Sequence, residues 1–240
     1  MNRRAFDRTT ASLQKALKTT LTPLADRERA QQMSNYMRGK FEYLGIATPV
    51  RRAAALPAIR AFKPAEAFGL LDASRNLWIM REREYQYAAL DLLDCYQKLL
   101  TTKELPALLN LVKDKSWWDT VDSLAGVIGR IVRREKRAGQ RLMDRCVKAE
   151  NLWVRRVAML HQLGWRTETD TVRLFGYAER LAPETDFFIR KAIGWALRDY
   201  AKHDRAAVEE FVGKERERLS PLTCREALLL RTKRSVSADT

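Results

Sequence analysis

The segment Lys115–Arg134, KSWWDTVDSLAGVIGRIVRR, contains a small residue, Ser123, from which a sequence repeat can be followed in both directions. Steps of 34 or 35 residues reach another small residue each time, always within a helical pattern: Ala53, Ala88, Ser123, Ala158, Ala192 and Ala227. A period of this length is typical of stacked helical pairs. The spacing therefore predicts a chain built from one repeated helix–turn–helix unit.

Other positions of the repeat agree with this interpretation. Two places before the small residue, four of the six repeats have an arginine: Arg51, Arg156, Arg190 and Arg225. Second amphipathic stretches lie between the repeated helices, at 104–113, 138–146, 169–180 and 206–212. One helical pair cannot bury its own apolar face, so we expect stacking, with the small residue allowing close approach of neighbouring helices. High helix propensity alone is the competing explanation for the alanines.

The composition excludes an all-β fold. Ten Gly and seven Pro are too few for the turns of a sandwich or barrel, and 46% hydrophobic residues can fill a full core. We predict an all-α fold, a superhelical solenoid of about six HEAT-like helical-pair repeats. The repeats are expected to form a single domain over residues 1–234, followed by a disordered tail at 235–240.

The charge balance indicates a polyanionic partner. Lys and Arg number 45 against 30 Asp and Glu, a net charge of +15, and nucleic acid is the simplest such partner. An anionic membrane surface would also require an exposed apolar segment, and none stands out. A cluster of bases is either a phosphate-contacting patch or a solvated face; it comprises Arg130, Arg133, Arg134, Lys136, Arg137, Arg141 and Arg145.

Few residues are available for metal or redox chemistry. The three cysteines form no C-x-x-C pair and there are only two histidines, which argues against a disulfide framework or a metal site. No signal peptide or membrane span is evident, and no phosphate-loop, dinucleotide or serine-hydrolase motif occurs. We expect a soluble cytoplasmic protein that acts as a monomer without metal or cofactor.

Four side chains form a candidate site. Trp118, Asp122 and Trp195 follow one another in four-residue steps along the same face of equivalent helices, and Arg156 lies in an adjacent sector of the helix between them. They are expected to converge across three repeats. Guanidinium binds phosphate and indole offers a flat face to a sugar or base. A carboxylate repels a polyanion, so Asp122 is either structural or chemical; beside a sugar C1′ it would stabilise the positive charge of a breaking N-glycosidic bond.

Each of these residues also has a purely structural interpretation. Asp122 fits a surface carboxylate paired with Arg156 or with another arginine. Tryptophans at helical spacing are more often core residues, and we expect Trp117 and Trp153 in the core. His161 fits a packed or solvated side chain better than a catalyst.

Three segments closely resemble the AlkD-type DNA alkylpurine glycosylases. They are KSWWDTVD at 115–122, NLWVRR at 151–156 and FFIRKAIGWALRDYAK at 187–202. Further similarity at 36–49 and 82–89 extends the match over roughly residues 30–230. The resemblance implies a superhelix of HEAT-like repeats whose concave basic face holds duplex DNA. It also implies hydrolysis of cationic purines alkylated at N3 or N7, leaving an abasic site, without rotation of the nucleotide into a deep pocket.

The resemblance also assigns roles by motif. Asp122 would stabilise the oxocarbenium-like sugar and align water, Trp118 and Trp195 would pack against the deoxyribose, and Arg156 would hold phosphate near the lesion. No lysine of the motif is placed as a Schiff-base nucleophile, so no lyase activity is expected. Arg155 and the basic stretch 130–145 depart from the family pattern. These differences would change the affinity for DNA rather than the hydrolysis of the glycosidic bond. The predicted DNA contacts are Tyr36, Arg51, Arg155, Phe187, Phe188, Arg190 and Arg225.

A different class of function remains open on the residues alone. A non-catalytic HEAT-like scaffold that binds nucleic acid or an acidic protein requires the arginines but has no use for Asp122. Charge and aromatic side chains also fit an RNA partner.

Overall fold

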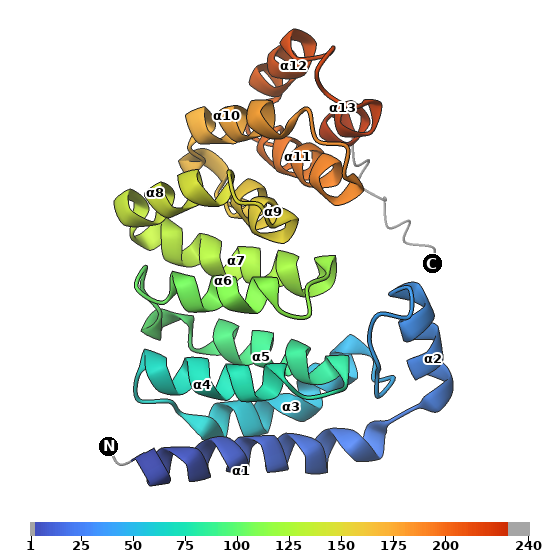
Figure 1. Cartoon of the computed structure of the whole chain (residues 1–240), viewed down its shortest axis with the longest axis vertical. Helices are drawn as coiled ribbons and strands as arrows, with labels where there is room; N and C mark the ends of the chain where they lie inside the picture. The colour runs from blue at the N-terminus through green and yellow to red at the C-terminus, as the bar shows by residue number, and fades with distance from the viewer. Residues whose placement is uncertain (1–2, 230–240) are drawn as a thin grey trace, which may run out of the picture. The chain divides into compact units, whose positions relative to one another are not determined.

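The computed structural model describes residues 3–229, with side chains from residue 10 onward. This part of the chain contains thirteen α-helices, three short 3-10 helices and no strand; one isolated bridge joins Glu42 and Glu82 (Figure 1). The all-α prediction is confirmed. The chain divides into two compact units, Met1–Gly139 (unit 1) and Gln140–Thr240 (unit 2), which are described separately. The tail predicted at 235–240 lies outside the described residues.

Unit 1 consists of two layers of helices. In the first layer, α5 packs between α3 and α7. In the second layer, α4 packs against α5 and α6. Helix α1 covers α3 and α4 (Figure 1). The 3-10 helices of this unit are η1 (Thr22–Leu24) and η2 (Gln97–Leu99). Its α-helices are α1 (Arg3–Leu21), α2 (Arg27–Tyr36), α3 (Thr48–Phe62), α4 (Ala67–Trp78), α5 (Arg83–Cys95), α6 (Leu105–Lys113) and α7 (Trp118–Arg134).

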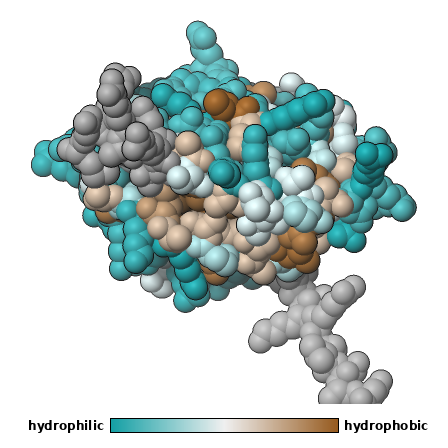
Figure 2. Space-filling view, turned by 90° about the horizontal axis from the view of Figure 1, so that it is seen from below, coloured by the Kyte–Doolittle hydropathy of each residue, from teal (hydrophilic) through white to brown (hydrophobic). Residues whose placement is uncertain are grey.

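The end of unit 1 that carries α1 has no further repeat packed on it within the unit. Figure 2 shows this end, where apolar surface lies between hydrophilic side chains. Leu24, Val50 and Leu56 are among the large apolar side chains that unit 1 exposes. None of the described helices combines the length and the apolarity needed to span a bilayer.

Unit 2 repeats the same arrangement. α11 packs between α9 and α13, and α10 and α12 cover this layer. Helix α8 (Lys136–Cys146) crosses the boundary between the units, and η3 (Arg166–Glu168) follows α9. The remaining helices are α9 (Leu152–Leu160), α10 (Thr171–Leu181), α11 (Phe187–Tyr200), α12 (Arg205–Lys214) and α13 (Pro221–Leu228).

Local signals in the sequence set where the helices begin. Asp26, Asn151, Asp186 and Ser220 occupy N-cap positions and accept hydrogen bonds from backbone N–H groups of the first turn. Proline lies in the first turn of α3, α6 and α13, where a missing N–H costs little. The caps at Asn151 and Asp186 fix the starts of α9 and α11, which carry Arg156 and Trp195.

The predicted period is confirmed in the helix boundaries. Helices α3, α5, α7, α9, α11 and α13 begin at intervals of 34 or 35 residues, and each contains one small residue of the repeat. The second amphipathic stretches correspond to α6, α8, α10 and α12 within a few residues.

The predicted role of the small residue is wrong at two positions. Ala88, like its counterparts in unit 2, is fully buried, but Ala53 and Ser123 are exposed. Ser123 Oγ donates to Asp119 O of its own helix, 3.0 Å away. In α3 and α7 the buried position lies two residues earlier, at Arg51 and Val121. The period fixes the spacing of the helices but does not determine which side of each helix is covered.

Candidate active site

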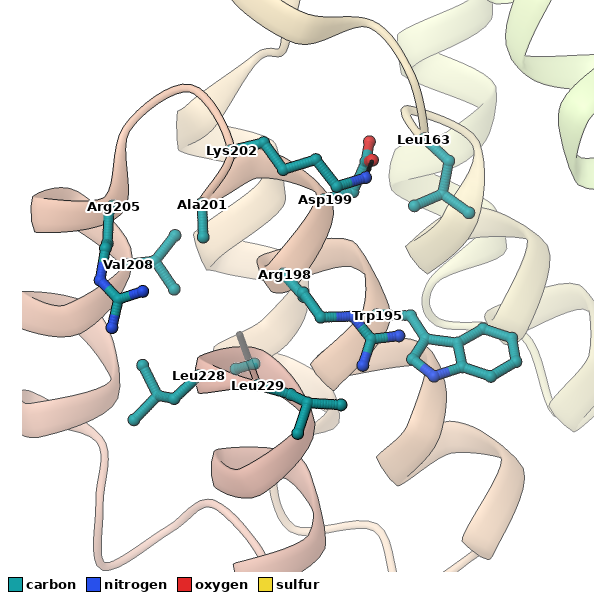
Figure 3. A pocket seen from close by; sticks show the side chains of 11 residues that line it. Leu163, Trp195, Arg198, Asp199, Ala201, Lys202, Arg205, Val208, Leu228 and Leu229 are labelled. Atoms are coloured by element: carbon teal, nitrogen blue, oxygen red, sulfur yellow. Dashed lines mark hydrogen bonds and ion pairs between the residues drawn. The ribbon is translucent and has the colours of Figure 1, made fainter. Parts of the chain in front are cut away.

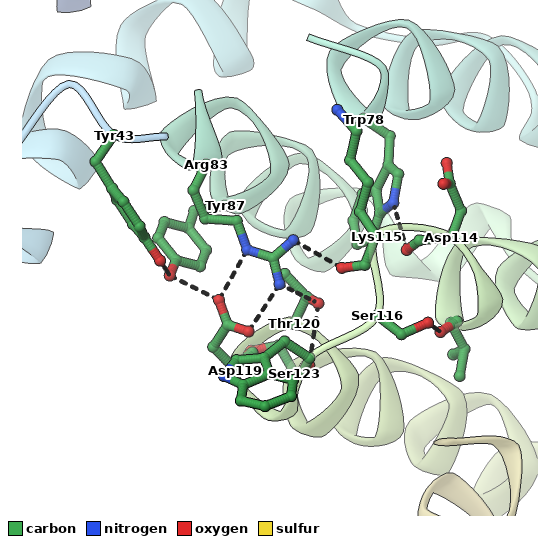
Figure 4. Close-up of polar contacts among 12 residues, drawn as sticks. Tyr43, Trp78, Arg83, Tyr87, Asp114, Lys115, Ser116, Asp119, Thr120 and Ser123 are labelled. Carbon is green, nitrogen blue, oxygen red and sulfur yellow. Dashed lines mark hydrogen bonds and ion pairs between the residues drawn. The ribbon is translucent and has the colours of Figure 1, made fainter. Parts of the chain in front are cut away.

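Helix α7 presents two carboxylates in its first two turns, and their surroundings differ. The Asp119 carboxylate accepts hydrogen bonds from Arg83 Nε at 2.9 Å, from Arg83 Nη2 at 2.7 Å and from Tyr87 OH at 2.7 Å (Figure 4). Its side chain is buried, and its charge is balanced by Arg83. Asp122 lies one turn further along, four residues after Trp118, and is half-buried. Asp119 is therefore engaged by Arg83 and Tyr87 within the protein, and Asp122 is the other carboxylate at the start of α7.

An exposed tyrosine at the end of α2 contacts Trp118. Tyr36 is the last residue of α2, is 73% exposed, and meets Trp118 edge to face with ring centroids 6.1 Å apart. Tyr36, Trp118 and Asp122, all in unit 1, are called the α7 cluster below. The cluster joins two aromatic rings and a carboxylate in a chain with a large excess of positive charge. Such a surface suits a sugar that becomes cationic.

In unit 2 the predicted phosphate ligand Arg156 is buried. Only 1% of the residue is exposed, its guanidinium donates to Phe188 O, and the guanidinium carbon lies 5.4 Å from the Trp195 ring centroid. Arg156 therefore contacts Phe188 and Trp195 of α11 from the interior of unit 2. Its guanidinium is buried, whereas a side chain that binds phosphate would be exposed to solvent.

Trp195 is held by a carboxylate that we did not predict. Its Nε1 donates to Glu226 Oε2 at 3.1 Å, and Glu226 also accepts from Lys191 at 2.8 Å and from Arg198 at 3.0 Å. The hydrogen bond from Lys191 is the main reason that the pKa of Glu226 lies below its usual value. The indole thus has a fixed orientation at the edge of α11.

Trp195 also lines a pocket of unit 2 between α11, α12 and α13. The pocket has a volume of about 480 Å³ and combines the apolar side chains Leu163 and Leu228 with the cations of Arg198 and Lys202 (Figure 3). Both cations are paired with carboxylates, Arg198 with Glu226 and Lys202 with Asp199, which also lines the pocket.

The other predicted aromatic contacts lie at the start of α11. Phe187 is largely exposed, and its ring centroid is 5.4 Å from that of Phe188. Phe188 packs on Trp153 with centroids 5.0 Å apart. Trp153 is buried, as is Trp117 in unit 1, so the prediction that both lie in the core is confirmed.

The predicted arginine contacts have different surroundings. Arg51 is 3% exposed and paired with Asp91, so it is not available to a phosphate. Arg155 forms a bidentate ion pair with the Glu184 carboxylate, with N–O distances of 2.6 and 2.8 Å. Arg190 Nε donates a hydrogen bond to the backbone carbonyl of Glu184. Arg225 is exposed on α13. The arginine column is therefore not a uniform exposed stripe.

The basic stretch 130–145 is also divided. Arg130 pairs with Asp94, and Arg134 donates to the carbonyls of Gln97 and Leu100, so both side chains tie α7 to the end of α5 within unit 1. All seven bases of the stretch, including these two, have exposed side chains. His161, which we expected to be packed or solvated, is buried, and burial lowers its pKa to about 4.

The comparison with known proteins adds independent information. The model of a family described as DNA alkylation repair enzyme matches residues 17–230. The chain belongs to the DNA alkylation repair enzyme family. A solved structure described as a predicted DNA alkylation repair enzyme from Enterococcus faecalis is 32% identical, with a TM-score of 0.80 over 85% of this chain and 94% of that chain. No curated protein matches the sequence.

Membership of the DNA alkylation repair enzyme family confirms the resemblance drawn from the sequence and assigns the protein to DNA repair. The match includes the whole α7 cluster and every aromatic residue described above in unit 2. The polyanion inferred from the charge balance is therefore DNA.

Residues that hold the site in place were missed at the sequence level. They include Arg83, Asp119 and Glu226. Asp119 is 36 residues from Arg83, and Glu226 is 31 residues from Trp195, so each pair joins adjacent repeats. The repeat itself is a signal for Arg83–Asp119 and Lys191–Glu226, since opposite charges about one period apart lie on neighbouring helices.

Proposed function

We propose that this protein is a DNA glycosylase that hydrolyses the N-glycosidic bond of cationic N3- and N7-alkylpurines in duplex DNA. The observation that carries the proposal is the position of Asp122 four residues after Trp118, within the motif at 115–122 that lies inside the family match. The other carboxylate at the start of α7, Asp119, is engaged by Arg83 and Tyr87. A carboxylate near the surface of a DNA-binding protein opposes binding, so Asp122 is either structural or chemical, and the family motif around it favours a role in chemistry.

The proposed reaction needs a carboxylate and a water molecule. An alkylated purine carries a positive charge and leaves as a neutral base, so positive charge moves to the deoxyribose as the bond breaks. Asp122 stabilises that charge and orients the water whose oxygen bonds to C1′. The proton of that water passes to the solvent, and the products are the free base and an abasic site.

Aromatic residues position the sugar in this proposal. Trp118 packs against the deoxyribose of the lesion, and Tyr36 supports its ring edge-on. A π face near the sugar also favours the developing positive charge. In unit 2, Trp195 and Phe187 contact the sugar–phosphate backbone, and exposed bases such as Arg225 bind phosphate.

Two further features support a simple hydrolysis without deep base flipping. Lys115 begins the motif, and its Nζ donates to Met80 O at 2.6 Å, a contact within the protein that argues against a role as a Schiff-base nucleophile. The α7 cluster is open to solvent at Tyr36, as expected for a site that reaches the sugar from outside the duplex. Alkylation has already weakened the glycosidic bond, so a shallow site suffices.

The test is release of free base from a duplex that contains N7-methylguanine, comparing the wild type with Asp122→Asn. We expect the wild type to release the base and the variant to be slower by at least about 10²-fold, the usual effect of removing one group that stabilises the transition state. The variant should bind the duplex at least as well at fixed salt, because a negative charge has been removed.

A matched control is Glu210→Gln, which removes an exposed carboxylate of α12 outside the α7 cluster. This variant should keep the wild-type rate. If no base is released from N7- or N3-methylated duplexes, yet the wild type and Asp122→Asn both bind DNA, the glycosylase proposal fails and a DNA-binding scaffold replaces it.

A further inference from the structure

The first turn of α5 contacts two segments that carry the α7 cluster, and Arg83 makes the first set of contacts. The residue is fully buried, and its guanidinium stacks on Phe41 with 3.7 Å between the guanidinium carbon and the ring centroid. In addition to its bidentate pair with Asp119, it donates to Thr120 Oγ1 and to Lys115 O, both at 2.9 Å (Figure 4). One side chain thus holds the backbone before α7 and two residues of its first turn.

The next residue, Glu84, makes the second set of contacts. It is also fully buried, and its carboxylate accepts hydrogen bonds from the backbone N–H groups of Leu44 at 2.9 Å, Gly45 at 2.9 Å and Ile46 at 3.2 Å. These residues belong to the loop that follows α2. A buried carboxylate is stable only when its oxygens are satisfied in this way.

The loop held by Glu84 in turn fixes α2. Gly45 has a left-handed φ of +86°, and a Cβ at this position would overlap Asp26 O and lie 2.6 Å from Ala30 N. Asp26 N donates to Leu44 O at 2.8 Å. The loop therefore packs directly on the first turn of α2, whose last residue is Tyr36.

Two tyrosines close the network between these segments. Tyr87 OH donates to Asp119, and the hydroxyl of Tyr43 lies 3.4 Å from that of Tyr87. Burial, reinforced by the negative charge of Asp119, raises the pKa of Tyr87. Tyr87 therefore stays protonated and acts as a hydrogen-bond donor.

We propose that Arg83 and Glu84 are positioning residues that set Tyr36 against Trp118 beside Asp122. Arg83 acts through Asp119 on the first turn of α7, and Glu84 acts through the loop at 44–46 on α2. Neither side chain touches the substrate. The inference rests on the proposed function for its catalytic consequence, while the geometric consequence can be measured separately.

The test uses two near-isosteric variants, Asp119→Asn and Glu84→Gln. We expect kcat for base release from N7-methylguanine duplex to fall about 10²-fold in each, because small displacements of catalytic groups have effects of this size. The Kd for unmodified duplex should change less than about twofold, since binding relies on phosphate contacts elsewhere. A general loss of structure would change both quantities together.

A spectroscopic measurement reports the geometry directly. The edge-to-face contact of Tyr36 and Trp118 should contribute a near-ultraviolet circular dichroism band, identified by its loss in Tyr36→Ala. We expect Asp119→Asn and Glu84→Gln to lose the same band while their thermal unfolding remains cooperative. Asp119→Asn, the milder change, carries the test if Glu84→Gln does not fold.

Arg81→Met is the matched control. It removes an exposed ion pair with Glu42 in the same region, two residues before Arg83, and should leave kcat and the band unchanged. A folded Asp119→Asn with wild-type kcat and an intact band would overturn the inference while leaving the glycosylase proposal in place. If the wild type releases no base, the glycosylase proposal fails, and the band still decides whether α5 sets the geometry.

Discussion

The surroundings of His161 determine how its ring is protonated. Its Nδ1 lies 2.6 Å from Ala158 O and its Nε2 lies 3.0 Å from Gln140 Oε1. A neutral imidazole has one N–H, which must point to the carbonyl, so Nε2 requires a donor. The Gln140 amide nitrogen is buried, and in the amide orientation that brings it to His161 Nε2 it donates to this ring nitrogen.

This neutral, buried histidine makes the stability of the protein depend on pH. Burial lowers the pKa of His161 from 6.5 to about 4. The pKa of His161 is lower in the folded protein than in the unfolded chain, so the unfolded chain binds the proton first as the pH falls. The free energy of unfolding is therefore highest above pH 6.5 and decreases as the pH falls toward 4. The full loss is on the order of 3 kcal/mol.

Urea unfolding at a series of pH values from 7.5 to 4 tests this prediction. His161→Leu should be less stable than the wild type near neutral pH, yet its free energy of unfolding should fall less steeply between pH 6.5 and 4. His203→Leu, which changes an exposed histidine, should keep the wild-type slope. Identical slopes in His161→Leu and the wild type would show that His161 does not titrate as described.

The residues that make up the site were only partly predictable. The motif at 115–122 predicts Trp118 and Asp122, because this segment resembles the AlkD-type glycosylases and places both side chains on one helical face. Arg83, Glu84 and Glu226 were missed, because charged residues in an amphipathic helix are normally assigned to the solvent. Their burial depends on partners in another repeat, and the sequence of one repeat does not contain that information.

At the level of elements, the repeat predicted where helices begin but not what covers them. Helix α5 is packed against α3, α4 and α7, so residues all around it are buried, including Ala88. Ala53 occupies the same register position on α3 and is exposed. Equivalent positions therefore differ in burial because the neighbours of each helix differ, which the period alone does not encode.

This difference predicts different costs for the same substitution. Ala88→Leu inserts three carbon atoms into a filled core and should lower the free energy of unfolding by about 1–3 kcal/mol. Ala53→Leu adds the same atoms at an exposed position and should change it by less than about 0.5 kcal/mol. The measurement is urea unfolding of both variants and the wild type. Equal effects would mean that the repeat positions are equivalent after all.

At the scale of the whole molecule, net charge is a better guide to DNA binding than any column of arginines. The net charge is +15, but Arg51, Arg83 and Arg155 are engaged with Asp91, Asp119 and Glu184. Their positive charges stabilise the protein itself. The bases available to phosphate are those that remain exposed, and Arg225 is one of them.

Salt dependence of binding separates these two kinds of arginine. Each phosphate contact adds about 0.9 to the magnitude of the slope of log K against log salt concentration, since counterions are released. Arg225→Gln should therefore reduce the slope by about 1 and weaken binding most at low salt. The matched variant is Arg51→Gln, which removes a buried arginine of the same column and leaves Asp91 paired with Arg52. Its slope should equal that of the wild type.

Fluorescence anisotropy of a labelled unmodified duplex between about 50 and 200 mM salt provides the measurement. A reduced slope for Arg51→Gln would mean that Arg51 leaves Asp91 to bind phosphate, and that the arginine column contacts DNA as its periodicity predicted.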